Sequence, residues 1–325
     1  MRTPHLIRSV VYGCLAAVTL VVGTASAQVT TLKIGYGGGQ PDVGDVADYL
    51  GYQQLGSAYQ VDRQSLGSDS AGVSALASGH LDIANVDLVS AIKAAQQGLP
   101  IRVLIAANAK QEFVFVAKDS IESLADLKGQ RVAFHSIGST TEYYAHLVVT
   151  KLAGLNMNDV KWLVIEGSNN RASALLANRI DATVLEWADW LELKKKGGFK
   201  ILSTFNDVAP YAVATAYVTT QSWLDKHPQA AQDFVTAMAE GYRQAYSDKQ
   251  AFMAEAAKLV PEVPTENVSG TYDFYTQIGM FPEADTFSPE NWQKTDEYFR
   301  QVKEYSDPAP YDLVASDILS SAWTQ

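Results

Sequence analysis

Hydrogen-bond donors at the expected start of a helix form the first candidate binding group in the sequence. Residues 138–141 read Gly-Ser-Thr-Thr and lie between a predicted strand and a predicted helix. The first N–H groups of a helix have no intrahelical partners and carry partial positive charge. These groups and the hydroxyls of Ser139, Thr140 and Thr141 could therefore bind a sulfonate, carboxylate or phosphate oxygen. The same hydroxyls could instead only cap the helix.

Acidic side chains at the ends of predicted loops form a second candidate group. Asp69, Asp87, Glu112 and Glu186 could pair with an amine on a ligand, although each could also be an N-cap or a solvated side chain. Arg171 brings the opposite charge to another predicted loop. Its planar guanidinium could clamp an anion, or it could lie on the surface.

The other candidates are small, polar or aromatic residues in or near such loops. They are Gly38, Gln40, Ser70 and Trp187. The three glycines at residues 37–39 would let a ligand approach the backbone, but they lack the later glycine of a dinucleotide-binding fingerprint. Trp187 could form a flat wall for an aromatic or alkyl ligand, or it could simply pack against its neighbours.

The sequence lacks the residue patterns that several classes of enzymatic chemistry require. The single cysteine, Cys14, lies in the N-terminal segment, and the five histidines show no metal-ligand spacing. There is no Gly-x-Ser-x-Gly elbow and no Walker-type loop. We therefore expect no metal, no cofactor and no enzymatic activity.

The first 27 residues have the pattern of an export signal. Arg2 and Arg8 precede a largely apolar run over residues 10–23, and small residues follow at 25–27. The run is too short to span a bilayer as a helix. We expect cleavage before Gln28 and release into the periplasm as a monomer. The whole chain has a net charge of −11, which argues against nucleic acid as a partner.

The order of predicted elements indicates two α/β lobes. Short β-rich runs alternate with helical patterns up to about residue 220, and helices dominate after that. We expect residues 28–114 and 219–325 to form lobe 1, and residues 115–218 to form lobe 2. The predicted hinge crossings lie at residues 113–118 and 214–220. The C-terminal helices, the first predicted over residues 225–247, would return to brace lobe 1.

Several stretches of the sequence resemble a known family. They are ALASGHLDIA at residues 75–84, LADLKGQRVA at 124–133, Gly-Ser-Thr at 138–140, ALLANRIDA at 174–182 and Lys-His-Pro at 226–228. These elements are similar to those of the substrate-binding proteins of ABC importers for taurine, alkanesulfonates, nitrate and pyrimidine precursors. The overall likeness is nearest to the taurine-binding branch.

The resemblance implies a two-lobed periplasmic binding protein of type II, which closes on its ligand through two hinge crossings. It also implies the function of a solute-binding protein, with the permease of an ABC importer at the inner membrane as its partner. We expect the ligand to be a small organic sulfonate or carboxylate, zwitterions included. One alternative is a neutral or cationic nitrogen compound, such as a pyrimidine precursor, held by Asp87 or Glu186. Another is a protein that presents its ligand to a sensor.

Overall fold

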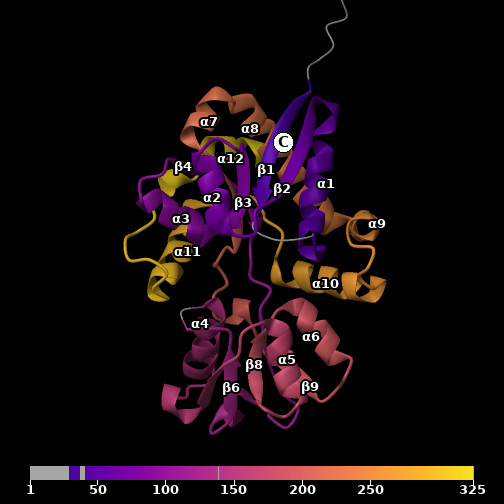
Figure 1. The fold of residues 1–325 in the computed structure, drawn as a ribbon, viewed down its shortest axis with the longest axis vertical. Coiled ribbons are helices and arrows are strands. Elements are labelled where there is room, and N and C mark those ends of the chain that lie inside the picture. The colour runs from indigo at the N-terminus through magenta and orange to yellow at the C-terminus, as the bar shows by residue number, and fades with distance from the viewer. Residues whose placement is uncertain (1–28, 37–40, 138, 325) are drawn as a thin grey trace, which may run out of the picture.

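The molecule has two sheets in two lobes, each sheet flanked by helices (Figure 1). The computed structural model describes residues 29–36, 41–137 and 139–324. The predicted signal segment and its cleavage point, as well as Gly38 and Gln40, lie outside these residues. The arrangement confirms the predicted α/β fold with two lobes.

Each sheet has five strands. The first sheet has the order β2-β1-β3-β10-β4, and its strands are β1 (Thr30–Tyr36), β2 (Tyr59–Ser65), β3 (Ile83–Asp87), β4 (Ile101–Asn108) and β10 (Thr215–Thr220). The second sheet has the order β7-β6-β8-β5-β9, and its strands are β5 (Val114–Lys118), β6 (Arg131–Phe134), β7 (Lys161–Val164), β8 (Ala182–Leu185) and β9 (Phe199–Thr204).

The two sheets share one pattern of strand directions. In the first, β1 is parallel to β2 and β3, whereas β10 is antiparallel to β3 and β4. In the second, β6 is parallel to β7 and β8, whereas β5 is antiparallel to β8 and β9. In each sheet, the antiparallel strand is the one that the chain enters directly after leaving the other lobe.

The helices fall into three groups along the chain. The first lobe contains α1 (Val46–Gln54), α2 (Asp69–Ala77) and α3 (Leu88–Gln96). The second contains α4 (Thr140–Leu147), α5 (Ser168–Leu176) and α6 (Trp187–Lys194). The C-terminal group is α7 (Gln221–Lys226), α8 (Pro228–Ser247), α9 (Lys249–Leu259), α10 (Thr265–Ile278), α11 (Pro289–Gln301) and α12 (Ser316–Trp323).

The C-terminal helices return to the first lobe, as predicted. Helix α8 packs on α1, α12 and β4, and its backbone meets α1 at a pair of glycines. A Cβ atom on Gly241 would lie 2.2 Å from the backbone nitrogen of Gly51, so only glycine permits this approach. The single helix predicted over residues 225–247 is wrong, because Pro228 starts a separate helix after a break at His227.

The chain passes between the sheets over residues 109–113 and 205–214. The predicted crossings at 113–118 and 214–220 are therefore wrong by a few residues, since those segments form β5 and β10. Backbone hydrogen bonds join the two crossings at both ends, from Ala214 N to Asn108 O (3.0 Å) and from Phe205 N to Phe113 O (3.0 Å). The expected boundary at residue 219 falls inside β10. The exact residue limits of the two lobes stay a prediction.

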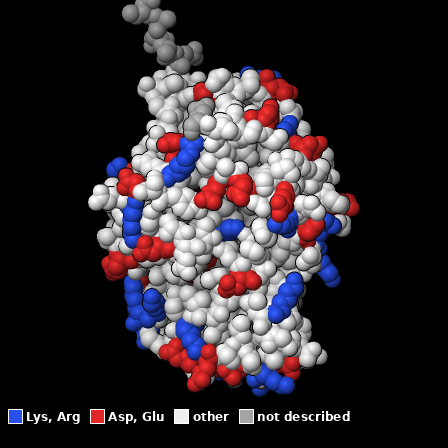
Figure 2. Space-filling model, turned by 180° about the vertical axis from the view of Figure 1, so that it is seen from behind, with Lys and Arg blue, Asp and Glu red and all other residues white. Residues whose placement is uncertain are grey.

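The surface carries both signs of charge. On the face opposite to that of Figure 1, acidic and basic side chains are interspersed and separated by uncharged surface (Figure 2). In the part of the chain that the structure describes, no helix has both the length and the apolar character to cross a membrane.

Candidate functional site

The candidate site is the cleft between the lobes, where three neighbouring cavities open. Figure 1 shows α6 facing α10 on one side of this cleft, and α4 lying below α11 on the other. We name the cavities by their walls: the first-lobe cavity, the α6–α10 cavity and the α4–α11 cavity. Asp42 lines the first two, and Asp87 lines the first and third, so the three are parts of one cleft.

The first-lobe cavity, of about 590 Å³, lies at the carboxyl ends of β1, β3 and β4. This is where ligands bind in open α/β sheets. Five of its lining side chains are carboxylates: Asp42, Asp45, Asp48, Asp69 and Asp87. None of its described lining residues is Lys, Arg or His. The cavity therefore offers oxygen acceptors and negative charge.

Asp48 is the most buried of these acids, with 4 % of its surface exposed. The hydroxyl of Tyr242 donates to its Oδ1 (2.8 Å), and the amide of Asn85 approaches its Oδ2 at 3.5 Å. Burial raises the pKa of Asp48 to about 7, since the charged form loses hydration that neutral donors replace only in part. A cationic group in the cavity would stabilise the charged form of Asp48.

Asp45 has a basic partner behind the cavity wall. The guanidinium of Arg63 forms an ion pair with its carboxylate and lies 3.6 Å from the ring centroid of Tyr36. Burial still raises the pKa of Asp45 to about 6. Asp45 and Arg63 therefore form a paired unit beside the unpaired Asp48.

Asp87 caps α3 and also faces the cleft. Its Oδ1 accepts hydrogen bonds from the backbone N–H groups of Val89 (2.8 Å) and Ser90 (3.3 Å). Burial, together with the nearby charge of Asp69, raises the pKa of Asp87 to about 6. Burial also raises the pKa of Asp69. Asp87 is thus an N-cap that also lines the cavity, and its pairing with an amine stays a prediction.

The α6–α10 cavity, of about 350 Å³, brings Glu112, Glu186 and Trp187 together. The hydroxyl of Tyr275 donates to Glu112 Oε2 (2.6 Å). Burial raises the pKa of Glu112 to about 7, and burial also raises that of Glu186. Trp187 stacks on Phe274 across the cleft, with ring centroids 3.7 Å apart.

The α4–α11 cavity, of about 330 Å³, contains Ser139 and Thr140 together with Asp87. Ser139 caps α4, since its Oγ accepts from the backbone N–H of Glu142 (3.2 Å). Thr141 is buried, and its hydroxyl accepts from the backbone N–H of His135 (2.9 Å). Of the three predicted hydroxyl residues, Ser139 and Thr140 therefore line the cleft and Thr141 lies behind them.

Two other predicted residues lie away from the three cavities. Arg171 has only 1 % of its surface exposed, and its guanidinium donates to the backbone carbonyls of Val184 (2.9 Å) and Ile165 (3.2 Å). Of the two alternatives for Arg171, the surface position is wrong, and the role in anion binding stays a prediction. Ser70 is exposed on α2, whereas Ser68 lines the first-lobe cavity and caps that helix.

Several lining residues of the first-lobe cavity were not among the residues predicted from the sequence. They are Asp42, Asp45, Asp48, Asn85, Asn108 and Thr215. Asn85 lies within β3, Asn108 ends β4 and Thr215 begins β10, so adjacent strands bring them to one edge of the sheet. The positions of Asn108 and Thr215 at strand ends were an available signal, whereas Asn85 lies within β3 and Asp48 within α1.

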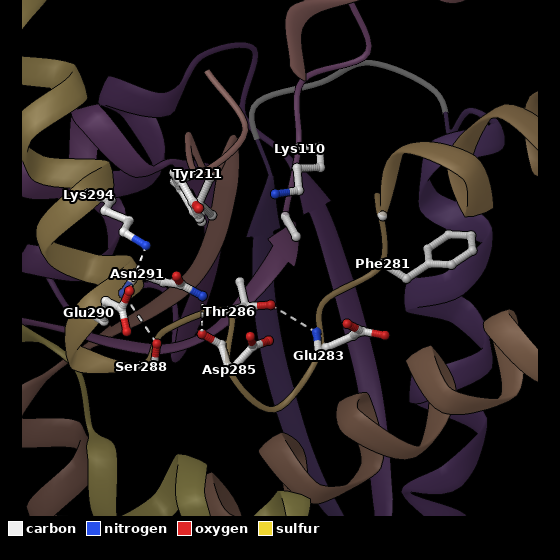
Figure 3. Close-up of a pocket in the computed structure, with 13 residues that line it drawn as sticks. Lys110, Tyr211, Phe281, Glu283, Asp285, Thr286, Ser288, Glu290, Asn291 and Lys294 are labelled. Carbon is white, nitrogen blue, oxygen red and sulfur yellow. Dashed lines mark hydrogen bonds and ion pairs between the residues drawn. The ribbon is translucent and has the colours of Figure 1, made fainter. Parts of the chain in front are cut away.

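A further cavity, of about 530 Å³, lies where both crossings meet the segment from 279 to 294 (Figure 3). Lys294 pairs with Glu290 (2.7 Å) and lies 4.2 Å from the ring centroid of Tyr211. Burial lowers the pKa of Lys110, which donates to the backbone carbonyl of Pro210. Lys294 and Glu290 of this hinge cavity are thus held by each other, and Lys110 by the backbone. Among all the residues described, no group of three His, Cys, Asp or Glu could hold a metal ion.

Comparison with known proteins places the chain in a family. Residues 60–251 match the model of the family described as NMT1/THI5 like. The chain belongs to the NMT1/THI5-like family. Among its relatives is the taurine-binding periplasmic protein of Escherichia coli strain K12, 30 % identical over 185 residues. That match covers 55 % of this chain and 55 % of the relative, so the chain matches about half the length of this curated protein.

Solved structures share the fold of this NMT1/THI5-like chain. The periplasmic sulfonate-binding protein SsuA from Methylobacillus flagellatus has a TM-score of 0.69 at 15 % identity, covering 91 % of this chain and 94 % of that one. The periplasmic aliphatic sulphonate-binding protein SsuA from Escherichia coli has a TM-score of 0.63 at 18 % identity, covering 88 % and 92 %. At these identities the likeness concerns the fold.

Proposed function

We propose that this protein is an extracytoplasmic solute-binding protein of an ABC importer. Membership of the NMT1/THI5-like family, the two-lobed fold and the periplasmic binding proteins among its relatives support the proposal. In this function the protein acts in the periplasm as a monomer and delivers its solute unchanged to a permease. The candidate residues have no nucleophile with an adjacent general base, which favours binding over catalysis.

The solute that fits the cleft best carries a cationic nitrogen. The single observation that carries this choice is the set of carboxylates facing the first-lobe cavity, with no basic residue among its described lining. A buried carboxylate is costly unless a cation pairs with it, so an ammonium group on the solute would relieve that cost. The cleft therefore favours the nitrogen-compound alternative over a purely anionic sulfonate or carboxylate.

A zwitterion fits the same arrangement. Ser139 and Thr140, at the start of α4, line one cavity together with Asp87. The hydroxyls and the free N–H groups of the helix start can bind an acidic group, while Asp87 pairs with an ammonium group. An amino sulfonate or an amino acid would meet both requirements at once.

A binding panel tests the proposed function. Taurine, ethylamine, ethanesulfonate and a pyrimidine would each be added to the purified protein during thermal unfolding. A true ligand at about 100 times its Kd adds about 2.7 kcal/mol to the free energy of unfolding. We expect nitrogen-bearing compounds to raise Tm, small-angle scattering to show a more compact molecule, and the compound to be recovered unchanged. A chemically altered compound, or no binding by any compound of a broad panel of small solutes, would contradict the proposal.

A further inference from the structure

The α6–α10 cavity differs from the rest of the cleft because much of its wall is apolar. Its apolar lining consists of Val43, Trp187, Ala188, Leu191, Val263 and Pro264. A group of two or three carbon atoms would leave much of a 350 Å³ cavity unfilled. Since apolar surface gains free energy when it leaves water, this wall favours a ligand with a larger hydrocarbon body.

Two carboxylates beside this apolar wall, Glu112 and Glu186, form no ion pair with Lys or Arg among the described residues. A third, Glu192, pairs with Lys195 (2.8 Å), and the charge of Arg171 acts on Glu186. Glu112 is held by the hydroxyl of Tyr275 and has no cationic partner among its described contacts. The charges of Glu186 and Asp42 act on Glu112 and oppose its ionisation. The described lining of the α6–α10 cavity contains no Lys, Arg or His. A cationic nitrogen is the group that would satisfy Glu112 and Glu186 together.

Trp187 supplies an independent indication of a ligand. Only 9 % of its surface is exposed, and its Nε1 has no hydrogen-bond partner anywhere in the described structure. A buried indole N–H normally has an acceptor, because leaving it unpaired costs about 1–3 kcal/mol. Trp187 lines the cavity and its ring is held by the stack on Phe274, so the position of the unpartnered N–H is fixed.

We propose that the α6–α10 cavity binds the hydrocarbon body of an arylalkyl or alkyl amine, whose cationic nitrogen pairs with Glu112 and Glu186. The N–H of Trp187 donates to an acceptor atom on the same ligand. This inference rests on the proposed function and specifies the class of solute that the cleft takes. It separates such amines from small amino sulfonates, which lack the hydrocarbon body.

Three probes test the inference on the unaltered protein, with calorimetry as the measurement. Phenethylamine has both the body and the charge, ethylamine has the charge alone, and 2-phenylethanesulfonate has the same body with the opposite charge. We expect phenethylamine to bind about tenfold more tightly than ethylamine, and the sulfonate not to bind. Equal affinity for the two amines, or tighter binding of the sulfonate, would overturn the inference.

Variants then identify the partner of the nitrogen. Glu112→Gln keeps an acceptor for the Tyr275 hydroxyl but removes the negative charge, and we expect it to weaken phenethylamine binding about tenfold. Glu283→Gln makes the same chemical change in the hinge cavity and is the matched control, for which no change is expected. Unchanged binding by a folded Glu112→Gln variant would contradict the assigned role.

An NMR signal tests the role of Trp187 separately. Trp187→Phe keeps a ring to stack on Phe274 and identifies the indole N–H resonance by its loss. In the unaltered protein, that resonance should move when phenethylamine carrying a methoxy group is added, and an unmoved resonance would refute the donor role. If ethylamine, phenethylamine and methoxyphenethylamine all fail to bind while taurine or another solute binds and compacts the protein, this inference is wrong and the proposed function stands. If no solute of the panel binds, the proposed function itself is wrong.

Discussion

Asp181 in the second lobe and Asp48 in the first show two opposite uses of a buried carboxylate. Asp181 accepts hydrogen bonds from the backbone N–H and the guanidinium of Arg131 and pairs with Lys118 (2.5 Å). These hydrogen bonds hold the pKa of Asp181 well below its usual range. Asp48, by contrast, contacts only neutral donors, and burial raises its pKa.

The difference separates scaffold from site. Asp181 joins the turn before β8 to β6 and so fixes the register of two strands. Its pairing is complete within the protein. Asp48 lines a cavity and forms no ion pair among the described residues, and the nearby Arg63 pairs with Asp45. A buried carboxylate without a cationic partner lowers the stability of the ligand-free protein and favours the binding of a cationic ligand.

The largest expected effect is on the scaffold. Asp181→Asn should lower the free energy of unfolding by about 3 kcal/mol, because Arg131 and Lys118 lose their shared counter-charge in a largely buried position. Urea unfolding measures this change. Asp119→Asn, at an exposed position nearby, is the control and should change stability little. If Asp181→Asn lowers the free energy of unfolding no more than the control does, Asp181 does not stabilise the scaffold and no longer differs from Asp48.

The second expected effect is a dependence of stability on pH. The pKa values of Asp45 and Asp87 are raised to about 6, and those of Asp48 and Glu112 to about 7. The folded protein therefore holds more protons than the unfolded chain between about pH 4 and pH 7, and its stability falls as the pH rises through this window. Asp181 adds no slope there, because its lowered pKa acts only below about pH 4.

Thermal unfolding without ligand measures this slope. We expect the free energy of unfolding to be about 2 kcal/mol higher at about pH 5 than at about pH 8. Stability that instead rises with pH over this range would mean that the cleft carboxylates are paired within the protein.

A smaller effect of opposite sign is expected in the cleft itself. Asp48→Asn removes a buried charge, and its side-chain oxygen can still accept from Tyr242. We expect the stability advantage of the variant over the original protein to be about 1 kcal/mol larger at about pH 8 than at about pH 5. Urea unfolding at both pH values gives the comparison. If Asp48→Asn instead destabilises the protein at about pH 8 as much as Asp181→Asn does, the charge of Asp48 stabilises the fold in the same way as that of Asp181.

The smallest expected effect concerns contact between the lobes. Trp187→Ala removes the stack on Phe274, which contributes about 1 kcal/mol to the contact between α6 and α10. Scattering should show a larger radius of gyration for this variant without ligand, whereas Trp187→Phe should leave it unchanged. The same radius for Trp187→Ala as for the original protein would assign closure to other contacts, such as the hydrogen bond from Tyr143 to the carbonyl of Gln301 (2.7 Å).

The scaffold could be predicted from the sequence because its signals are local. Asp82 and Asp181 occupy equivalent places in the related stretches at 75–84 and 174–182. Each accepts from the backbone N–H of the neighbouring strand, at Lys33 (2.8 Å) and at Arg131 (3.0 Å). The alternation of strands and helices likewise depends on residues close in the chain, so the two-lobed fold followed from it.

The cleft was predicted only in part because burial depends on distant segments. Glu112, Glu186 and Trp187 were candidates, and the fold brings them into one cavity. Asp48 resembles any acid on a helix until Tyr242, 194 residues away, covers it. Arg171 looked accessible in a loop, yet α5 and β8 enclose it.

The antiparallel strand in each sheet also constrains the order of folding. The second sheet needs only residues 114–204, which form one continuous stretch. The first sheet inserts β10 between β3 and β4, so it cannot be completed until the chain up to residue 220 is available for pairing. When the chain becomes available for folding from its N-terminus, the second sheet can therefore form before the first is complete, because β4 has no neighbouring strand until β10 is added.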